Sequence, residues 1–329
     1  MIFQNLENCL KEMMDKSKLF GHLAVAVAYT IFGFNIIFCK DIANSHSISP
    51  SVLFSIRAIG ASALFWLLSL FLPKEKMAPK DILMTALASV LGLFLPQYSF
   101  LVATTMTTSI DLSVLGTLPP IFTMIFAAIF LKEPITAKKA GGVFLSLAGV
   151  LMLIFNSVSA HNGVEQTRPL GIALMLLNGV SFGAYLGIFR PLISRYSVVT
   201  FMKWMFLFSL LISLPFSAKG FVTTDFAAIT PSVVREIAFL VIFATFVSYF
   251  LIPVAQKRIR PTVISLYTYL QPMIATVFSI IIGMDSLTWQ KVVAIVLVFA
   301  GVAFVNRSKA APQDAEALVS ENSRGQVRK

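Results

Sequence analysis

The sequence is poor in charge. Only 12% of its 329 residues are Asp, Glu, Lys or Arg, whereas a soluble domain carries about 25%. That leaves too little polar surface to coat a water-soluble globule of this length. The composition therefore excludes an ordinary soluble domain and indicates that lipid covers much of the surface.

Residues that hold metals or form disulfides are also scarce. The two cysteines, Cys9 and Cys39, make no CxxC pair and no disulfide framework. The three histidines, His22, His46 and His161, are too widely spaced for a HExxH-type metal site. We therefore expect no metal ion and no cofactor.

What the sequence has in excess is apolar residues, which make up 57% of the chain and give a mean hydropathy of +0.84. A bilayer core requires about 20 apolar residues per helix, and the strands of a β-barrel would be shorter and alternate in polarity. The runs predict an all-α integral membrane protein with ten transmembrane helices. The predicted spans are Leu19–Cys39, Ser51–Leu72, Ile82–Ala103, Ser109–Leu131, Lys138–Asn156, Leu170–Phe189, Val199–Ser217, Glu236–Ala255, Thr262–Ile282 and Thr288–Asn306.

The basic residues predict the orientation of these helices. If the N-terminus lies on side one, 19 of the 26 Lys and Arg residues fall on side one. Five fall on side two (Lys40, Arg168, Lys219, Arg235 and Lys291), and Arg57 and Lys203 lie inside spans. By the positive-inside rule side one is cytoplasmic, so both termini are predicted in the cytoplasm of a multi-pass plasma-membrane protein, in a bacterium the inner membrane. The charges form no basic stripe with interleaved aromatics, so nucleic acid is not an expected partner.

The chain is predicted to have five parts. Residues 1–18 form a cytoplasmic segment without the features of a signal peptide. Residues 19–156 form a first five-helix repeat, 157–169 a linker loop, and 170–306 a second five-helix repeat. Residues 307–329 are polar and are predicted to be a disordered cytoplasmic tail.

An internal repeat relates the two halves. A shift of 152 residues aligns Pro120 with Pro272, Glu133 with Asp285, Lys139 with Lys291, and Ala148–Val150 with Ala300–Val302, and a shift of 150 aligns Phe32–Gly33 with Phe182–Gly183 and Lys40 with Arg190. Because each half has five spans, an odd number, the second half is predicted to be inverted in the membrane. Inverted repeats are typical of secondary transporters, whose substrate site lies between the halves near the midplane.

The same positions carry a family resemblance. The sequence resembles EamA-type members of the drug/metabolite transporter superfamily in Gly33, Asn35, Lys40, Pro50, Arg57, Pro120, Lys132–Pro134, Gly142 and Ala148–Val150, and again in Pro272, Asp285, Thr288 and Ala300–Val302. The likeness covers roughly residues 20–306. It departs from the family at Asp285, where Glu is usual, and at Asp111, where a small apolar residue is usual. The resemblance implies ten helices, inverted halves, a central cavity, and efflux of a metabolite, amino acid or drug.

Prolines and charges inside the spans are candidate functional features. Pro120 and Pro272 are predicted to break spans four and nine and to free carbonyls near Gly116 and Thr268, either as structural kinks or as substrate ligands. Arg57, Asp111 and Lys203 are predicted to be gating or structural charges. For Arg57, three interpretations stay open: a clamp with Asp111 or Asp41, a site for a substrate carboxylate, and snorkelling to the interface.

Uncharged polar residues in the spans predict the walls of the cavity, although helix packing explains part of them. The predicted substrate-binding residues are Asn35, Gln97, Tyr98, Tyr185, Tyr249, Tyr267 and Gln271. Such walls would suit amphipathic neutral or zwitterionic ligands. No span holds a central carboxylate, so facilitated diffusion or exchange is as well supported as proton coupling. Glu133 and Asp285 are expected to fix helix ends by bonding backbone or basic neighbours.

These observations together predict a secondary transporter that exports a small metabolite, amino acid or drug-like compound through a central cavity by alternating access. The expected partners are a small-molecule substrate and membrane lipid. A lipid or carrier-lipid translocase is the alternative, and an intramembrane enzyme is disfavoured because no catalytic constellation is evident, so no catalytic residue is assigned. The small residues Gly142, Gly149, Ala294 and Gly301 predict helix-packing seams and leave a homodimer contact open.

Overall fold

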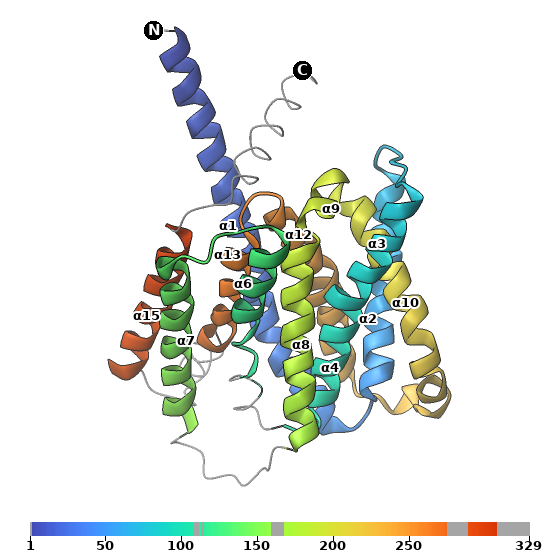
Figure 1. The fold of residues 1–329 in the computed structure, drawn as a ribbon. Coiled ribbons are helices and arrows are strands. Elements are labelled where there is room, and N and C mark those ends of the chain that lie inside the picture. The colour runs from blue at the N-terminus through green and yellow to red at the C-terminus, as the bar shows by residue number, and fades with distance from the viewer. Residues whose placement is uncertain (1, 108–111, 113–114, 159–167, 275–288, 308–329) are drawn as a thin grey trace.

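The computed structural model describes residues 2–107, 112, 115–158, 168–274 and 289–307, and these residues form helices without a β-strand. The first half contains α1 (Ile2–Ser45), α2 (Pro50–Leu70), α3 (Pro79–Ser89), the π-helical segment η1 (Val90–Phe94), α4 (Leu95–Ala103), α6 (Pro119–Phe130) and α7 (Ala137–Val158). The second half contains α8 (Pro169–Ile188), α9 (Arg190–Arg195), α10 (Val198–Thr223), η2 (Phe226–Ala228), α11 (Pro231–Phe239), the π-helical segment η3 (Leu240–Val247), α12 (Ser248–Gln256), α13 (Pro261–Leu266), η4 (Tyr267–Tyr269) and α15 (Trp289–Asn306). Figure 1 shows the long helices running side by side as a bundle.

Six helical segments in the described part of the chain are long and apolar enough to cross a bilayer. They are Lys16–Ser45, Pro50–Leu70, Pro79–Ala103, Pro169–Ile188, Val198–Thr223 and Pro231–Gln256. Pro119–Phe130 and Val292–Val305 are shorter apolar helices. The prediction of an all-helical chain is therefore confirmed for these residues, whereas the count of ten spans stays a prediction.

Proline sets the start of many of these helices. Pro50, Pro79, Pro119, Pro169 and Pro231 each occupy the first turn of a helix. Proline suits this position because the first N–H groups of a helix have no intrahelical acceptor and the ring presets the backbone angle φ. The local sequence therefore determines where each span begins.

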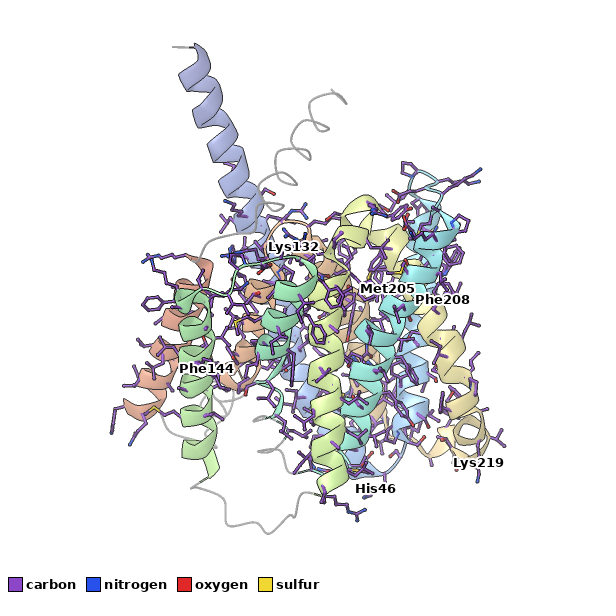
Figure 2. The ribbon with its side chains drawn as sticks, viewed as in Figure 1. His46, Lys132, Phe144, Met205, Phe208 and Lys219 are labelled. Atoms are coloured by element: carbon purple, nitrogen blue, oxygen red, sulfur yellow. The ribbon has the colours of Figure 1, made fainter. Side chains whose placement is uncertain are left out.

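The outside of the bundle is apolar. Leu83 of α3, Ile129 of α6 and Phe144 of α7 each expose more than half of their surface, and Phe144 points away from the bundle in Figure 2. Polar contacts lie inside instead, such as the hydrogen bond of 2.8 Å from Ser55 Oγ of α2 to Ser217 Oγ of α10. This distribution suits a protein whose surrounding solvent is lipid.

Two ends of the bundle can be distinguished. His46 and Lys219 lie at one end and Lys132 at the other (Figure 2), which agrees with the predicted assignment of the first two to side two and of Lys132 to side one. At Lys132 the backbone turns with φ of 54°, in the left-handed region, directly after α6. This turn brings the following residue, Glu133, back beneath the helix, where its N–H bonds the Ala127 carbonyl at 3.2 Å.

Helices α7 and α15 pack closely along the predicted seam of small residues. A Cβ atom at Gly142 would lie 2.6 Å from the Gly301 carbonyl oxygen, and one at Gly149 would lie 2.7 Å from the Ala294 carbonyl oxygen. These distances leave no room for a side chain, so glycine permits the close approach. The seam is thus used within the chain, and a homodimer stays a prediction.

Candidate functional site

A central cavity lies among α1, α2, α4, α8, α12 and the segments that precede α6 and follow α13. It is lined by Tyr29, Phe32, Asn35, Ile36, Arg57, Pro96, Gln97, Phe100, Leu112, Gly116, Pro119, Met175, Asn178, Phe182, Tyr249, Thr268 and Gln271. Four of the predicted substrate-binding residues, Asn35, Gln97, Tyr249 and Gln271, are in this lining. Among the described residues that form the wall, Arg57 is the one charged side chain. The walls therefore combine aromatic rings, amides and a single cation.

Irregular helix turns flank the cavity on two sides. The π-helical segment η1 comes just before Gln97 in one wall, and η3 comes just before Tyr249 in another. Within η3, the Thr245 hydroxyl donates to the Leu240 carbonyl five residues earlier, at 2.6 Å. Segments of π-helix are frequent at functional sites because they break the regular ladder and re-aim side chains.

The predicted helix breaks also lie at the cavity. Residues 116–118 form a turn outside the helices, and α6 starts at Pro119, so Pro120 lies in the first turn of α6, where its missing N–H costs no bond. In the second half, η4 is a tight 3₁₀ turn that ends three residues before Pro272. Gly116 and Thr268, where the freed carbonyls were predicted, both line the cavity.

Three of the predicted substrate-binding tyrosines lie outside this lining. Tyr98 stacks on Phe94 with ring centroids 5.5 Å apart, in an aromatic cluster between α4 and α10. Tyr185 is 1% exposed, and its ring covers Gly92 of η1. Tyr267 bonds the His22 Nδ1 atom of α1 through its hydroxyl at 2.8 Å.

The predicted charges have different surroundings. Arg57 is buried, with 2% of its surface exposed, and its Nε atom donates to Thr245 Oγ1 at 2.8 Å. Lys203 of α10 lies over the Trp66 ring of α2, with Nζ 4.9 Å from the ring centroid. Asp111 lies outside the described residues, as does Asp285.

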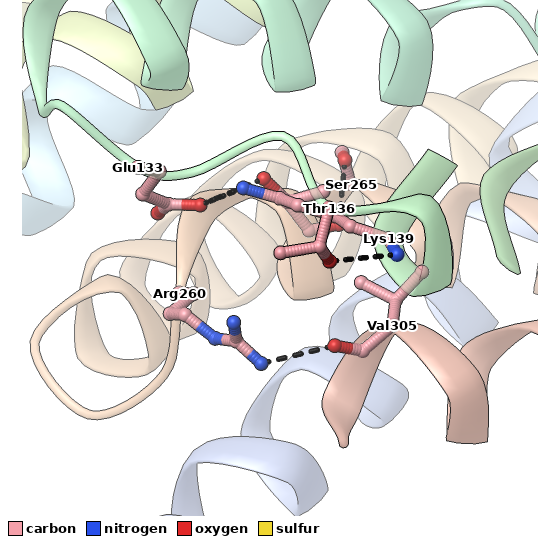
Figure 3. Close-up of polar contacts among 7 residues, drawn as sticks. Glu133, Thr136, Lys139, Arg260, Ser265 and Val305 are labelled. Atoms are coloured by element: carbon pink, nitrogen blue, oxygen red, sulfur yellow. Dashed lines mark hydrogen bonds and ion pairs between the residues drawn. The ribbon is translucent and has the colours of Figure 1, made fainter. Parts of the chain in front are cut away.

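A buried ion pair lies on side one of the bundle. Glu133, which follows α6, pairs with Lys139 of α7, and both side chains have 1% or less of their surface exposed. Thr262 of α13 donates to the same carboxylate oxygen at 3.1 Å. Figure 3 shows this pair beside Arg260, whose Nη2 atom donates to the Val305 carbonyl at the end of α15 at 3.0 Å. Glu133 thus joins three helices, as expected for a residue that fixes helix ends.

Loops on side one form a second, more exposed network. Arg195, the last residue of α9, pairs with Asp81 of α3 at 3.3 Å, and the Tyr196 hydroxyl donates to Asp81 at 2.7 Å. Glu75, in the loop between α2 and α3, accepts the Ser197 N–H at 2.9 Å. Burial raises the pKa of Glu75, but hydrogen bonds from Ser197 and Thr200 and the charge of Lys257 outweigh this and lower it below the usual value.

Two basic residues each tie together two elements of the same half, at opposite ends of the bundle. On side two, Lys40 of α1 donates to the carbonyls of Thr104 and Thr107, after α4, both at 3.3 Å. On side one, Arg190 of α9 donates through Nε to the carbonyl of Gln256, at the end of α12, at 3.0 Å. A cation at the C-terminal end of a helix is favoured because the last carbonyls have no intrahelical donor. We refer to these contacts as the Lys40 tie and the Arg190 tie.

The sequence profile of the EamA-like transporter family matches the chain twice, over residues 19–155 and 169–307. The chain belongs to the EamA-like transporter family. It is therefore a multi-pass membrane protein of transporter type.

Named relatives agree with this assignment. The chain is 30% identical over 189 residues to the uncharacterized transporter YcxC of Bacillus subtilis, an alignment that covers 56% of this chain and 60% of YcxC. It is 21% identical over 315 residues to the uncharacterized transporter YetK of the same organism, covering 94% of both chains. A solved crystal structure covers 88% of this chain and 96% of its own with a TM-score of 0.68 at 14% identity, which shows a shared fold.

Several lining residues were not among those predicted to bind substrate: Tyr29, Phe32, Phe100, Met175, Asn178 and Phe182. In a sequence so rich in Phe, the aromatic and Met residues of this group are indistinguishable from residues that face lipid or pack in the core. A signal did exist for two of them, because the internal repeat aligns Phe32 with Phe182. An aromatic residue at both positions of an aligned pair inside the spans was a reason to consider these two residues for the surface between the halves.

Proposed function

We propose that this protein is a secondary transporter that exports a small amphipathic metabolite, amino acid or drug-like compound by alternating access. The substrate occupies the central cavity, between two inverted five-helix repeats of a ten-helix protein. Both termini are cytoplasmic, and side two faces the outside of the plasma membrane. The family assignment supports a transport function, and the cavity is the place where we expect the substrate to bind.

One observation carries this proposal: the cavity is lined by four pairs of repeat-related positions. Phe32 pairs with Phe182 at the shift of 150, and Gln97 with Tyr249, Gly116 with Thr268 and Pro119 with Gln271 at the shift of 152. Positions related by a twofold axis lie together only near that axis. A cavity at the axis of two inverted repeats is where transporters of this construction bind substrate.

Helix contacts support the same symmetry. The repeat relates α1 to α8 and α4 to α12. A contact between α1 and α12 should therefore have a counterpart between α8 and α4. Both contacts are present: α1 packs on α12, and α4 packs on α8. The α2–α10 and α7–α15 pairs each map onto themselves, and both are in contact. The Lys40 and Arg190 ties follow the same rule, because Lys40 aligns with Arg190 and Thr104 with Gln256.

Close contacts at single glycines follow the repeat as well. A Cβ atom at Gly33 of α1 would lie 3.2 Å from Ile274 Cγ2, and one at Gly183 of α8 would lie 2.8 Å from Phe122 Cβ of α6. Gly183 corresponds to Gly33, and Ile274 to Phe122. One sequence pattern in two orientations provides two states of similar energy, one open to each side.

The transport proposal is tested with purified protein in liposomes, by measuring uptake of pooled labelled metabolites. Gln97→Ala and Gln271→Ala, which remove amides from the cavity wall, should lower the flux several-fold, with normal folded yield. Tyr267→Phe is the matched control, because it removes only the hydroxyl bonded to His22 outside the lining, and it should retain flux. Scrambling of labelled lipid without metabolite uptake would establish the translocase alternative instead.

Topology is tested by cysteine labelling in a background without Cys9 and Cys39. A cysteine at Lys76 should react only from the cytoplasm, and a cysteine at Lys219 only from outside. Reaction of both from the same side would contradict the ten-span arrangement.

A further inference from the structure

Arg57 is a buried cation in the cavity wall whose described contacts are all to neutral groups. Its Nε atom donates to Thr245 Oγ1 at 2.8 Å, and its Nη1 atom donates to Cys39 Sγ at 3.8 Å. The Thr245 hydroxyl already donates its own proton to Leu240, so it can only accept from Arg57. The Cys39 thiol likewise donates to Asn35 Oδ1 at 3.7 Å. These contacts hold the guanidinium in place and leave its charge uncompensated.

In the part of the chain that the structure describes, no carboxylate contacts Arg57. Glu236 of α11 lies near Cys39, but neither it nor Asp41 of α1 forms an ion pair with Arg57, and the described lining of the cavity contains no Asp or Glu. A buried charge is stable only when it is paired or well hydrogen-bonded. Three of the five guanidinium N–H groups therefore have no acceptor among these residues, while the side chain borders a space open to a ligand.

We propose that Arg57 binds a carboxylate of the transported compound, so that the substrates are amphipathic organic anions. This inference rests on the proposed transport function and specifies its substrate class. The planar fork of arginine matches the two oxygens of a carboxylate. The rest of the wall suits the remainder of such a molecule: Phe32, Phe100 and Phe182 offer apolar surface, and the amides of Gln97 and Gln271 offer hydrogen bonds.

The Tyr29 and Thr268 hydroxyls add polar groups to the cavity wall. Both line the cavity, they lie near each other, and neither has a partner at standard hydrogen-bond geometry within the described residues. Unpaired hydroxyls in a buried wall are costly unless a ligand or water satisfies them. The described lining thus combines one cation, at Arg57, with neutral polar groups.

The test compares acids with their neutral amides as probes. Purified wild-type protein is titrated with N-acetylphenylalanine, N-acetylleucine and N-acetylmethionine and with the matched amides, and binding is followed by thermal stabilisation. At least one acid should bind about 10- to 100-fold more tightly than its amide, the range expected for a charge-assisted bidentate bond. Equal binding of acids and amides, or no binding of any acid, would overturn the inference.

Variants identify the residue responsible. Arg57→Gln should lose the preference for acids over amides, whereas Arg57→Lys should keep the preference with weaker binding, because it retains the charge and loses the fork. If Arg57→Gln does not fold, the preference for acids over amides in Arg57→Lys and in the wild type still tests the carboxylate site. An Arg57→Lys variant without preference for acids contradicts the proposal.

A second pair of variants separates substrate binding from a clamp with Asp111, a residue outside those described. Asp111→Asn should leave the preference for acids intact. Recovery of wild-type acid binding in Arg57→Gln/Asp111→Asn would mean that Arg57 serves only to neutralise Asp111. Flux of an acid that is equal in wild type and Arg57→Gln would overturn the carboxylate site and leave transport standing, whereas no flux of any compound would reject transport itself.

Discussion

The Lys40 tie and the Arg190 tie occupy repeat-related positions at opposite ends of the bundle, yet their chemistry differs. Arg190 is 9% exposed and donates at 3.0 Å to a carbonyl of the fully buried Gln256. Lys40 is half-buried and shares its ammonium group between two carbonyls at 3.3 Å. Longer bonds to a hydrated point charge are weaker than a bond from a buried guanidinium.

The difference teaches that two repeat-related contacts need not be equally strong, so the two gates of the proposed inverted arrangement would differ. The Arg190 tie is also backed by the Glu133–Lys139 pair and by the loop contacts of Asp81 and Arg195. We infer that side one is the more strongly closed end in this structure, and that its contacts must be broken before the cavity can open to the cytoplasm. If so, changes on side one should have the larger effects.

The largest effect is expected at Glu133, because it compensates a lysine with no exposed surface. Glu133→Gln leaves Lys139 buried without its counter-charge, which typically costs about 3–5 kcal/mol. Folded yield and unfolding temperature should fall sharply. The double variant Glu133→Gln/Lys139→Met removes both charges and should recover much of the loss. Unchanged yield together with lost substrate binding would show that Glu133 contacts substrate instead.

Arg190→Ala should open side one. Loss of a hydrogen bond from a charged group costs about 1.5–3 kcal/mol, which shifts a balanced two-state equilibrium more than tenfold. The readout is labelling of a cysteine introduced at Gln271, in the cavity, by a membrane-impermeant maleimide added from side one. Arg190→Lys is the control and should keep most of the closure. Unchanged labelling from side one would remove Arg190 from the gate.

Lys40→Ala should open side two by a smaller amount, about 1 kcal/mol or a several-fold faster labelling from outside. Lys40→Arg sharpens the comparison, because a guanidinium at this position should make the two ties more alike and slow labelling from side two. The ranking is the decisive result. Equal effects of Lys40→Ala and Arg190→Ala would mean that the chemical difference between the ties does not matter.

Much of the fold could be predicted from the sequence because its signals are local. Apolar runs and prolines such as Pro50 and Pro169 predict helix starts to within one residue of those in the structure. The repeat predicted paired helix breaks, and both Gly116 and Thr268 line the cavity. Seven residues were predicted to bind substrate, and four of them lie in the wall; whether they bind substrate stays a prediction.

The placement of Tyr98, Tyr185 and Tyr267 outside the lining could not be predicted from periodicity. Periodicity assumes a regular helix, whereas Tyr98 follows the π-helical segment η1 and Tyr267 begins the 3₁₀ turn η4, so it does not determine the faces of these two side chains. Tyr185 lies in the regular helix α8, and its packing over Gly92 is a tertiary contact that periodicity does not encode. Arg57 is identifiable from sequence, but its neutral surroundings require the structure.

The smallest expected effect concerns acid and the Glu75 contact on side one. The folded-state pKa of Glu75 is lowered from its usual value of 4.5. A lowered pKa means that the ionised carboxylate stabilises the closed loops above the unfolded value, and that this contribution is lost as pH falls through the folded pKa. The difference in unfolding temperature between wild type and Glu75→Gln should therefore be small at pH 7 and vanish on acidification well below pH 4.5. Glu75 is partly exposed, so solvent screening keeps the effect modest. Subtracting the variant removes the contributions of other groups from the comparison. A difference that stays constant down to strongly acidic pH would mean that the charge of Glu75 does not hold the loop, and the loop network would then add nothing to the Arg190 tie.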